Sequence, residues 1–174
     1  MIEGFIYRPD IVNGAEEEQF LNRLRAVPTA PLQMYGQPTK RRIASFGLDY
    51  RPSTPRLEPA PPLPEFLVVL RRRAASVAGI ESETLVQALV TWYPAGAQIG
   101  WHVDHPQFGD TVVAVSLGGP ATLELRPKGG PTILRHVIAP RSVYVLLPNL
   151  RYGHEHRVLA HEERVSVTFR SIAR

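Results

Sequence analysis

The sequence predicts an α+β protein in which helices precede a double-stranded β-helix, that is, a jelly-roll, cupin-like core. Two observations lead to this fold class. The first 84 residues contain two amphipathic segments with helix-capping signals. From residue 85 onward the chain consists of short β-branched or alternating runs parted by Gly, Pro and Asn. We therefore expect one domain over residues 1–174, with helices and a lid over 1–84 and the jelly roll over 85–174.

The N-terminal part is predicted to hold two helices. Residues 13–27 have apolar residues at helical spacing, and Asn13 is suited to cap the first turn, which is acidic. Residues 64–79 begin with Pro and end with Gly, as many helices do. Residues 50–64 are too rich in proline for a helix or a central strand, so we expect a surface loop between the two helices.

The C-terminal part is predicted to consist of strands only. The expected strands cover residues 85–93, 111–117, 121–127, 132–138, 142–147 and 164–172. Many short strands at near-regular spacing are typical of a sandwich or barrel, and a double-sheet jelly roll accommodates them.

The composition excludes several classes of protein. The chain has no cysteine, which excludes disulfides, thiolate ligands and cysteine nucleophiles. No apolar run is long enough for a membrane span, and the first residues lack the pattern of a signal peptide. We therefore expect a cytoplasmic monomer with no membrane partner. The net charge is +4, from 18 Arg and only 2 Lys, which is compatible with a phosphate-bearing partner but also with the base composition of the genome.

A His-x-Asp motif points to a metal site. In a strand, His102 and Asp104 project to the same side, so an imidazole and a carboxylate converge. His154 and His156 are also two residues apart, and either could supply a third ligand. Two histidines and one carboxylate on one side of a metal are the arrangement of non-haem Fe(II) oxygenases. The motif alone is weak evidence, since it occurs often by chance.

The last predicted strand strengthens this interpretation. Its polar residues, Arg164, Ser166, Thr168 and Arg170, alternate with an apolar packing face. If the polar face points into the barrel, two buried arginines require anions, because an unpaired buried charge is very costly. A short dicarboxylate lying along the strand, with its other end at the metal, would supply them.

Four segments together resemble the AlkB-like family of Fe(II)- and 2-oxoglutarate-dependent oxygenases. They are WYPAGAQIGWHVD, VAVSLGGPATLEL, LRYGHEHRV and RVSVTFR. The family has a Tyr nine residues before the histidine of its His-x-Asp motif, here Tyr93. It also has an Arg five residues before its last histidine ligand, and Arg151 therefore indicates His156 rather than His154.

The resemblance implies that His102, Asp104 and His156 hold Fe(II). The implied reaction uses O2 to convert 2-oxoglutarate oxidatively to succinate and CO2 while hydroxylating a C–H bond. Where that carbon is attached to nitrogen, the product releases an aldehyde, which amounts to dealkylation.

The resemblance also implies how 2-oxoglutarate is bound. Arg164 would bind the distal carboxylate with help from the hydroxyl of Tyr93, and Arg170 would stabilise the carboxylate beside the keto group. Thr91 stands where several members carry Asn, so it is a further candidate in the co-substrate site.

Residues 40–50 resemble the family's substrate lid. Arg41 and Arg42 are expected to contact phosphate, and Phe46 or Tyr50 to stack on a base. His105 is expected at the mouth of the pocket. These residues imply oxidative demethylation of alkylated nucleobases in single-stranded DNA or RNA, as in DNA repair.

Two alternatives remain open. Pro106 stands where DNA-repair members carry an acidic residue, so the same oxygenase chemistry could act on a protein side chain or a small molecule. The second alternative is a non-catalytic cupin-like module that only binds a metal.

Overall fold

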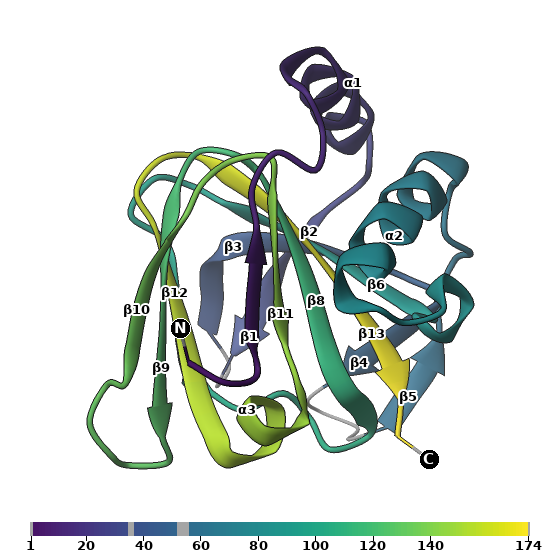
Figure 1. Ribbon diagram of the computed structural model, residues 1–174. Coiled ribbons are helices and arrows are strands. Elements are labelled where there is room, and N and C mark those ends of the chain that lie inside the picture. Colours follow the sequence, from purple (N-terminus) through teal and green to yellow (C-terminus); the bar gives the residue numbers. More distant parts are fainter. Residues whose placement is uncertain (1, 35–36, 52–55, 174) are drawn as a thin grey trace.

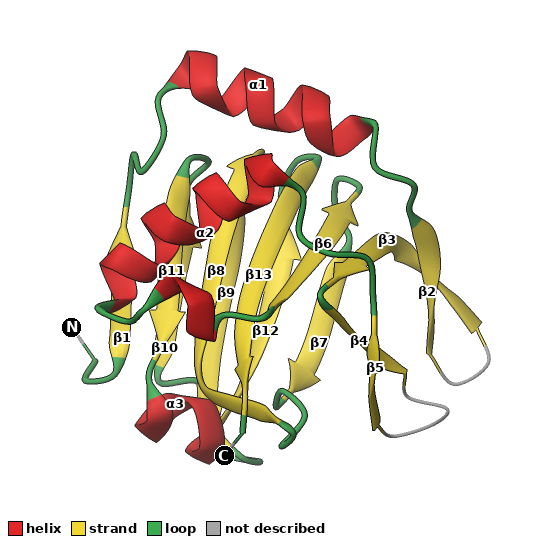
Figure 2. Ribbon diagram, turned by 90° about the vertical axis from the view of Figure 1, so that its right-hand side faces the viewer, coloured by secondary structure: helices red, strands yellow, loops and turns green. Residues whose placement is uncertain are grey.

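A computed structural model of the protein describes residues 2–34, 37–51 and 56–173. Two antiparallel sheets face each other, and two helices cover the outer face of the larger sheet (Figures 1 and 2). The core has two main layers: one lies between the larger sheet and the helices, the other between the two sheets. The helices within the described ranges are too short or too polar to cross a membrane.

The larger sheet has seven strands, and a second sheet has four. The order of the first is β1 (Phe5–Arg8), β11 (Ser142–Leu146), β8 (Phe108–Gly118), β13 (Arg164–Ile172), β6 (Gln87–Tyr93), β3 (Gln37–Phe46) and β2 (Ala30–Met34). The order of the second is β10 (Leu134–Ile138), β9 (Ala121–Pro127), β12 (His154–Ala160) and β7 (Gln98–His102). Strands β6 to β13 are distributed over the two sheets as in a jelly roll, which confirms the predicted double-stranded β-helix.

The two predicted helices are present and end at the expected signals. Helix α1 (Gly14–Arg25) starts at a capping box in which Asn13 and Glu16 bond each other's backbone N–H. Helix α2 (Glu65–Ala78) ends at Gly79, whose φ of 68° is accessible to glycine at little cost. A short 3₁₀ turn, η1 (Ser82–Thr84), follows it.

Two local predictions need correction. Helix α3 (Pro148–Gly153) interrupts the region where we expected only strands; its six residues are too few to show a helical period. The proline-rich stretch 50–64 contains strand β5 (Arg56–Pro59), which pairs with β4 (Leu48–Arg51) in a small hairpin. It is an edge element, where proline is tolerated. Residues 52–55 lie outside the described residues.

The two faces of β13 separate as the alternation predicts. Val165, Val167 and Phe169 belong to the core beneath the helices. On the opposite face, Arg164 and Arg170 are only 2% and 9% exposed. This face therefore points into the space between the sheets.

Candidate active site

Three residues that are distant in sequence converge between the sheets. His102 ends β7, and His156 lies directly opposite it in β12. Asp104 follows in the loop after β7, so the convergence does not come from strand alternation alone. The ligand atoms of these residues lie within 4.8 Å of one another. The Asp104 Oδ1 atom is 3.5 Å from Nε2 of His102 and 3.9 Å from Nε2 of His156.

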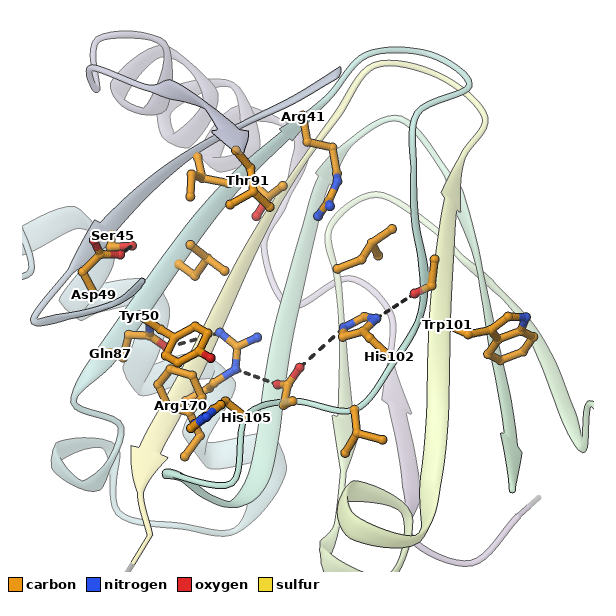
Figure 3. A pocket seen from close by; sticks show the side chains of 18 residues that line it. Arg41, Ser45, Asp49, Tyr50, Gln87, Thr91, Trp101, His102, His105 and Arg170 are labelled. Carbon is orange, nitrogen blue, oxygen red and sulfur yellow. Dashed lines mark hydrogen bonds and ion pairs between the residues drawn. The ribbon is translucent and has the colours of Figure 1, made fainter. Parts of the chain in front are cut away.

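Each of the two histidines can offer the lone pair of a ring nitrogen to a metal ion. Nδ1 of His102 lies 2.8 Å from the carbonyl oxygen of Gly100; when it donates its proton there, Nε2 is left free on the side of Asp104 (Figure 3). Burial and the neighbouring His102 lower the pKa of His156 to about 3, so His156 is neutral. Two imidazoles and a carboxylate at this separation suit Fe(II). His154 is not part of the cluster; its Nδ1 lies near the carbonyl oxygen of Asn149 instead.

Asp104 is held by a buried arginine. Burial by itself raises the pKa of this carboxyl, but Arg170, His102 and His156 together hold it well below its usual range. Nε of Arg170 donates to Oδ2 of Asp104 at 2.7 Å, and Nη1 donates to Oε1 of Gln87 at 3.2 Å. Arg170 is thus already engaged with the carboxylate of the triad. The predicted contact with 2-oxoglutarate would be an additional one.

The loop that carries Asp104 is fixed by Arg151. This side chain is 2% exposed and donates to the carbonyl oxygens of His105, Phe108 and Gly109. In the sequence, the position of Arg151 served only to indicate His156 as the third ligand. In the structure it positions the backbone next to Asp104.

An inner cavity extends from the triad along β13 and β6. It is lined at its far end by Tyr93 and Arg164, which are opposite each other, and the next facing pair, Thr91 and Ser166, lies between that end and the triad. Arg164 donates to the hydroxyl of Ser116 at 3.0 Å, and its guanidinium carbon lies 4.8 Å from the centre of the Tyr93 ring. The described residues that line this cavity include no Asp or Glu. The cavity is therefore suited to an anion.

An outer cleft of about 280 Å³ opens above the triad. Tyr50 and His105 both line it, and their ring centres are 4.4 Å apart with a 30° tilt (Figure 3). Phe108 adds further aromatic surface, whereas the ring of Trp101 points away from the cleft and lies against Arg126 and Arg157 (Figure 3). Of the four predicted substrate residues, the structure thus brings Tyr50 and His105 to the cleft.

The other two predicted substrate residues, Arg42 and Phe46, lie on the face of β3 that is turned away from the cleft. Arg42 is exposed and donates to the hydroxyl and carbonyl oxygens of Thr29. Phe46 packs against the core beneath the helices. Successive strand residues alternate between the two faces of a sheet. Arg42 and Phe46 therefore point away from the cleft, while Arg41 points toward it. Arg41 is buried and lines the cleft, as Figure 3 shows.

The sequence also matches a family model over residues 12–170, described as the 2OG-Fe(II) oxygenase superfamily. The chain belongs to this superfamily. The match confirms the predicted AlkB-like oxygenase class at the level of superfamily and fold. It also confirms the cofactor Fe(II), the co-substrate 2-oxoglutarate and the class of dioxygenase.

This 2OG-Fe(II) oxygenase is also similar to individual proteins. A segment of 87 residues is 37% identical to the RNA replication protein of Grapevine virus A (isolate Is 151), covering 48% of this chain but only 5% of the viral protein. The structure of OsALKBH1 has a TM-score of 0.77 at 15% identity, with 98% of each chain covered.

Two bacterial structures are also similar. A 2OG-Fe(II) oxygenase family oxidoreductase of Burkholderia pseudomallei has a TM-score of 0.65 at 18% identity, covering 97% of this chain and 85% of that one. A Pseudomonas putida prolyl-4-hydroxylase has a TM-score of 0.65 at 14% identity, covering 97% and 92%. At such identities the likeness concerns the fold and not the substrate.

Proposed function

We propose that this oxygenase demethylates alkylated nucleobases in single-stranded DNA or RNA. The observation that carries the proposal is the pair of adjoining rings, Tyr50 and His105, in an aromatic cleft directly above the triad. Flat aromatic side chains beside a reaction centre suit a base turned out of its strand. The net charge of +4 favours a polyanionic partner.

The residues of the site would divide the work as follows. His102, Asp104 and His156 would hold Fe(II), with Arg170 orienting Asp104. Arg164 would bind the distal carboxylate of 2-oxoglutarate at the far end of the inner cavity.

Bound Fe(II) and 2-oxoglutarate supply the oxidation of a C–H bond by O2, with release of succinate and CO2. The protein's own part is orientation. Arg151 keeps the loop after Asp104 in place, and the rings above the triad would direct the alkylated atom toward the metal.

The test is formaldehyde release from N-methylated single-stranded DNA, N-methylated RNA and methylated peptides, assayed side by side with Fe(II) and 2-oxoglutarate. We expect release from a nucleic acid. RNA deserves the first assay, because the 37% identical relative is named an RNA replication protein. Release from the peptides alone would overturn the nucleic-acid proposal and leave the oxygenase class intact.

A second candidate is the same chemistry on a protein side chain or a small molecule. It is favoured by the outward direction of Arg42, which removes an expected phosphate contact from the cleft. A non-catalytic metal-binding module would be favoured only if Fe(II) and 2-oxoglutarate gave no succinate.

A further inference from the structure

A third arginine lies in the inner part of the site. Arg41 is 4% exposed and lines both the outer cleft and the inner cavity. It belongs to β3, an element of the substrate side of the molecule, and not to the jelly-roll strands that carry the triad and Arg164. Its neighbour Arg42 has the same charge but points to the opposite face of the sheet.

The strand register places Arg41 at the far end of the cavity. In the ladder between β3 and β6, Arg42 is opposite Trp92, so Arg41 is one position further, beside Tyr93. On the other side of β6, Tyr93 is opposite Arg164. Arg41, Tyr93 and Arg164 thus form a row across three neighbouring strands. Two strand spacings of about 4.8 Å separate the backbones of the two arginines.

Both guanidinium groups lie close to the same ring. The guanidinium carbon of Arg41 is 5.9 Å from the centre of the Tyr93 ring, and that of Arg164 is 4.8 Å from it. Arg170 lies at the opposite end of β13, where Asp104 balances its charge. The end of the cavity away from the metal therefore has two guanidinium groups and a phenol, and no carboxylate is found among the residues described as its lining.

This arrangement matches a carboxylate better than it matches a neutral group. A carboxylate offers two oxygens, about four hydrogen-bond acceptor sites in all, and one guanidinium fork uses only part of them. A second cation in a buried cavity strengthens the attraction because the surroundings screen charge weakly.

We propose that Arg41 is a second positively charged ligand for the distal carboxylate of 2-oxoglutarate, acting together with Arg164. The inference deepens the proposed function, because it takes the inner cavity as the co-substrate site. Arg41 is then a specificity-determining residue: it selects a 2-oxo acid with a second carboxylate over one without it. Strand β3 also forms a wall of the outer cleft. Bound 2-oxoglutarate would therefore contact both this wall, through Arg41, and the jelly roll, through Arg164.

The experiment is calorimetric titration of the protein loaded with Mn(II), without O2, so that binding is measured without turnover. The ligands are 2-oxoglutarate and 2-oxopentanoate, which has a methyl group in place of the distal carboxylate. We expect Arg41→Leu to raise the Kd of 2-oxoglutarate by about 10- to 100-fold, as expected for the loss of a charged hydrogen bond. The Kd of 2-oxopentanoate should stay within about twofold of the wild-type value.

Arg42→Leu is the matched control, since it removes the same charge from the other face, and it should change neither Kd. Arg41→Lys retains the charge without the fork and should give an intermediate loss; it also serves if the leucine variant does not fold. An unchanged Kd of 2-oxoglutarate in Arg41→Leu would overturn the inference, as would an equal loss for both ligands. If the wild-type protein did not bind 2-oxoglutarate, the proposed function would fail first.

Discussion

Arg170 and Asp104 form a buried ion pair at 2.7 Å, and the acidic partner is also a member of the triad. The two residues are 66 positions apart in sequence. The arginine therefore links the last strand of the jelly roll to the loop that carries Asp104. Its charge keeps that carboxyl ionised despite burial.

Removing this cation should be costly. We expect Arg170→Leu to lower the free energy of unfolding by about 3 kcal/mol or more, because a buried carboxylate is left without its partner. Gln87→Leu removes only one hydrogen bond from the same guanidinium and should cost about 1 kcal/mol. Urea denaturation of the metal-free variants measures both values. Equal losses would mean that the ion pair contributes nothing beyond a hydrogen bond.

Substitution of the triad should abolish turnover. Asp104→Ala removes the only carboxylate of the cluster, and we expect no succinate from 2-oxoglutarate in the presence of Fe(II). His154→Ala is a suitable control because His154 lies in the same strand as His156 but outside the cluster. It should retain nearly full turnover. Undiminished succinate formation by the Asp104 variant would refute the metal assignment.

The far end of the inner cavity should govern the affinity for 2-oxoglutarate. Arg164→Ala should raise the KM for 2-oxoglutarate far more than Tyr93→Phe, because a charged, forked contact exceeds a single hydroxyl in strength. Succinate formation at varied 2-oxoglutarate concentration measures both. If the two variants behaved alike, the carboxylate would have to lie elsewhere.

Substitution of the two aromatic residues Phe46 and Tyr50 in the segment 40–50, the predicted lid, should have different effects. Tyr50→Ala should raise the KM for the primary substrate and leave succinate formation without that substrate unchanged, because Tyr50 lines the cleft. Phe46→Ala should instead lower the free energy of unfolding by about 2 kcal/mol, since Phe46 packs against the core. A substrate effect of Phe46→Ala at unchanged stability would contradict this division.

The metal-free protein should lose stability in mild acid. The pKa of His156 is about 3 in the folded protein against an ordinary value of 6.5, so the unfolded chain binds more protons between these values. The contribution of His156 to the free energy of unfolding is therefore fully present above pH 6.5. It is lost as the pH falls toward 3, by at most about 1.4 kcal/mol per pH unit. Denaturation in urea at several pH values, with a chelator present, measures the slope. His156→Gln should reduce the dependence of the unfolding free energy on pH. An unchanged slope in that variant would show that His156 is not its cause.

Much of the fold could be read from local patterns. The strands predicted over 121–127 and 164–172 match β9 and β13 residue for residue, because alternation and the flanking turn residues are local properties. The helix predicted over 64–79 begins directly after Pro64 and ends directly before Gly79, as these two residues indicated. Helix α3 could not be predicted because its six residues, fewer than two turns, show no helical period.

The candidate site was only partly accessible in this way. The resemblance to the AlkB-like family indicated His156 rather than His154, and the structure places His156 in the cluster. Strand alternation divides the predicted lid residues of β3: Arg41 shares a face with Ile43 and Ser45, all three lining the cleft, while Arg42 lies on the other face. A resemblance to a lid does not specify which face each residue takes, whereas the strand period does.

The order of residues along the chain was sufficient for the fold class, the His-x-Asp motif and the alternating faces of the last strand, since each depends on neighbours in sequence. The third ligand, His156, was indicated by the family resemblance. Only the folded chain could decide that Arg170 pairs with Asp104, that Tyr50 meets His105 and that Arg41 lies beside Tyr93. Such contacts depend on which strands adjoin and in what register. That choice is made by burying apolar faces across the whole jelly roll, and no single segment encodes it.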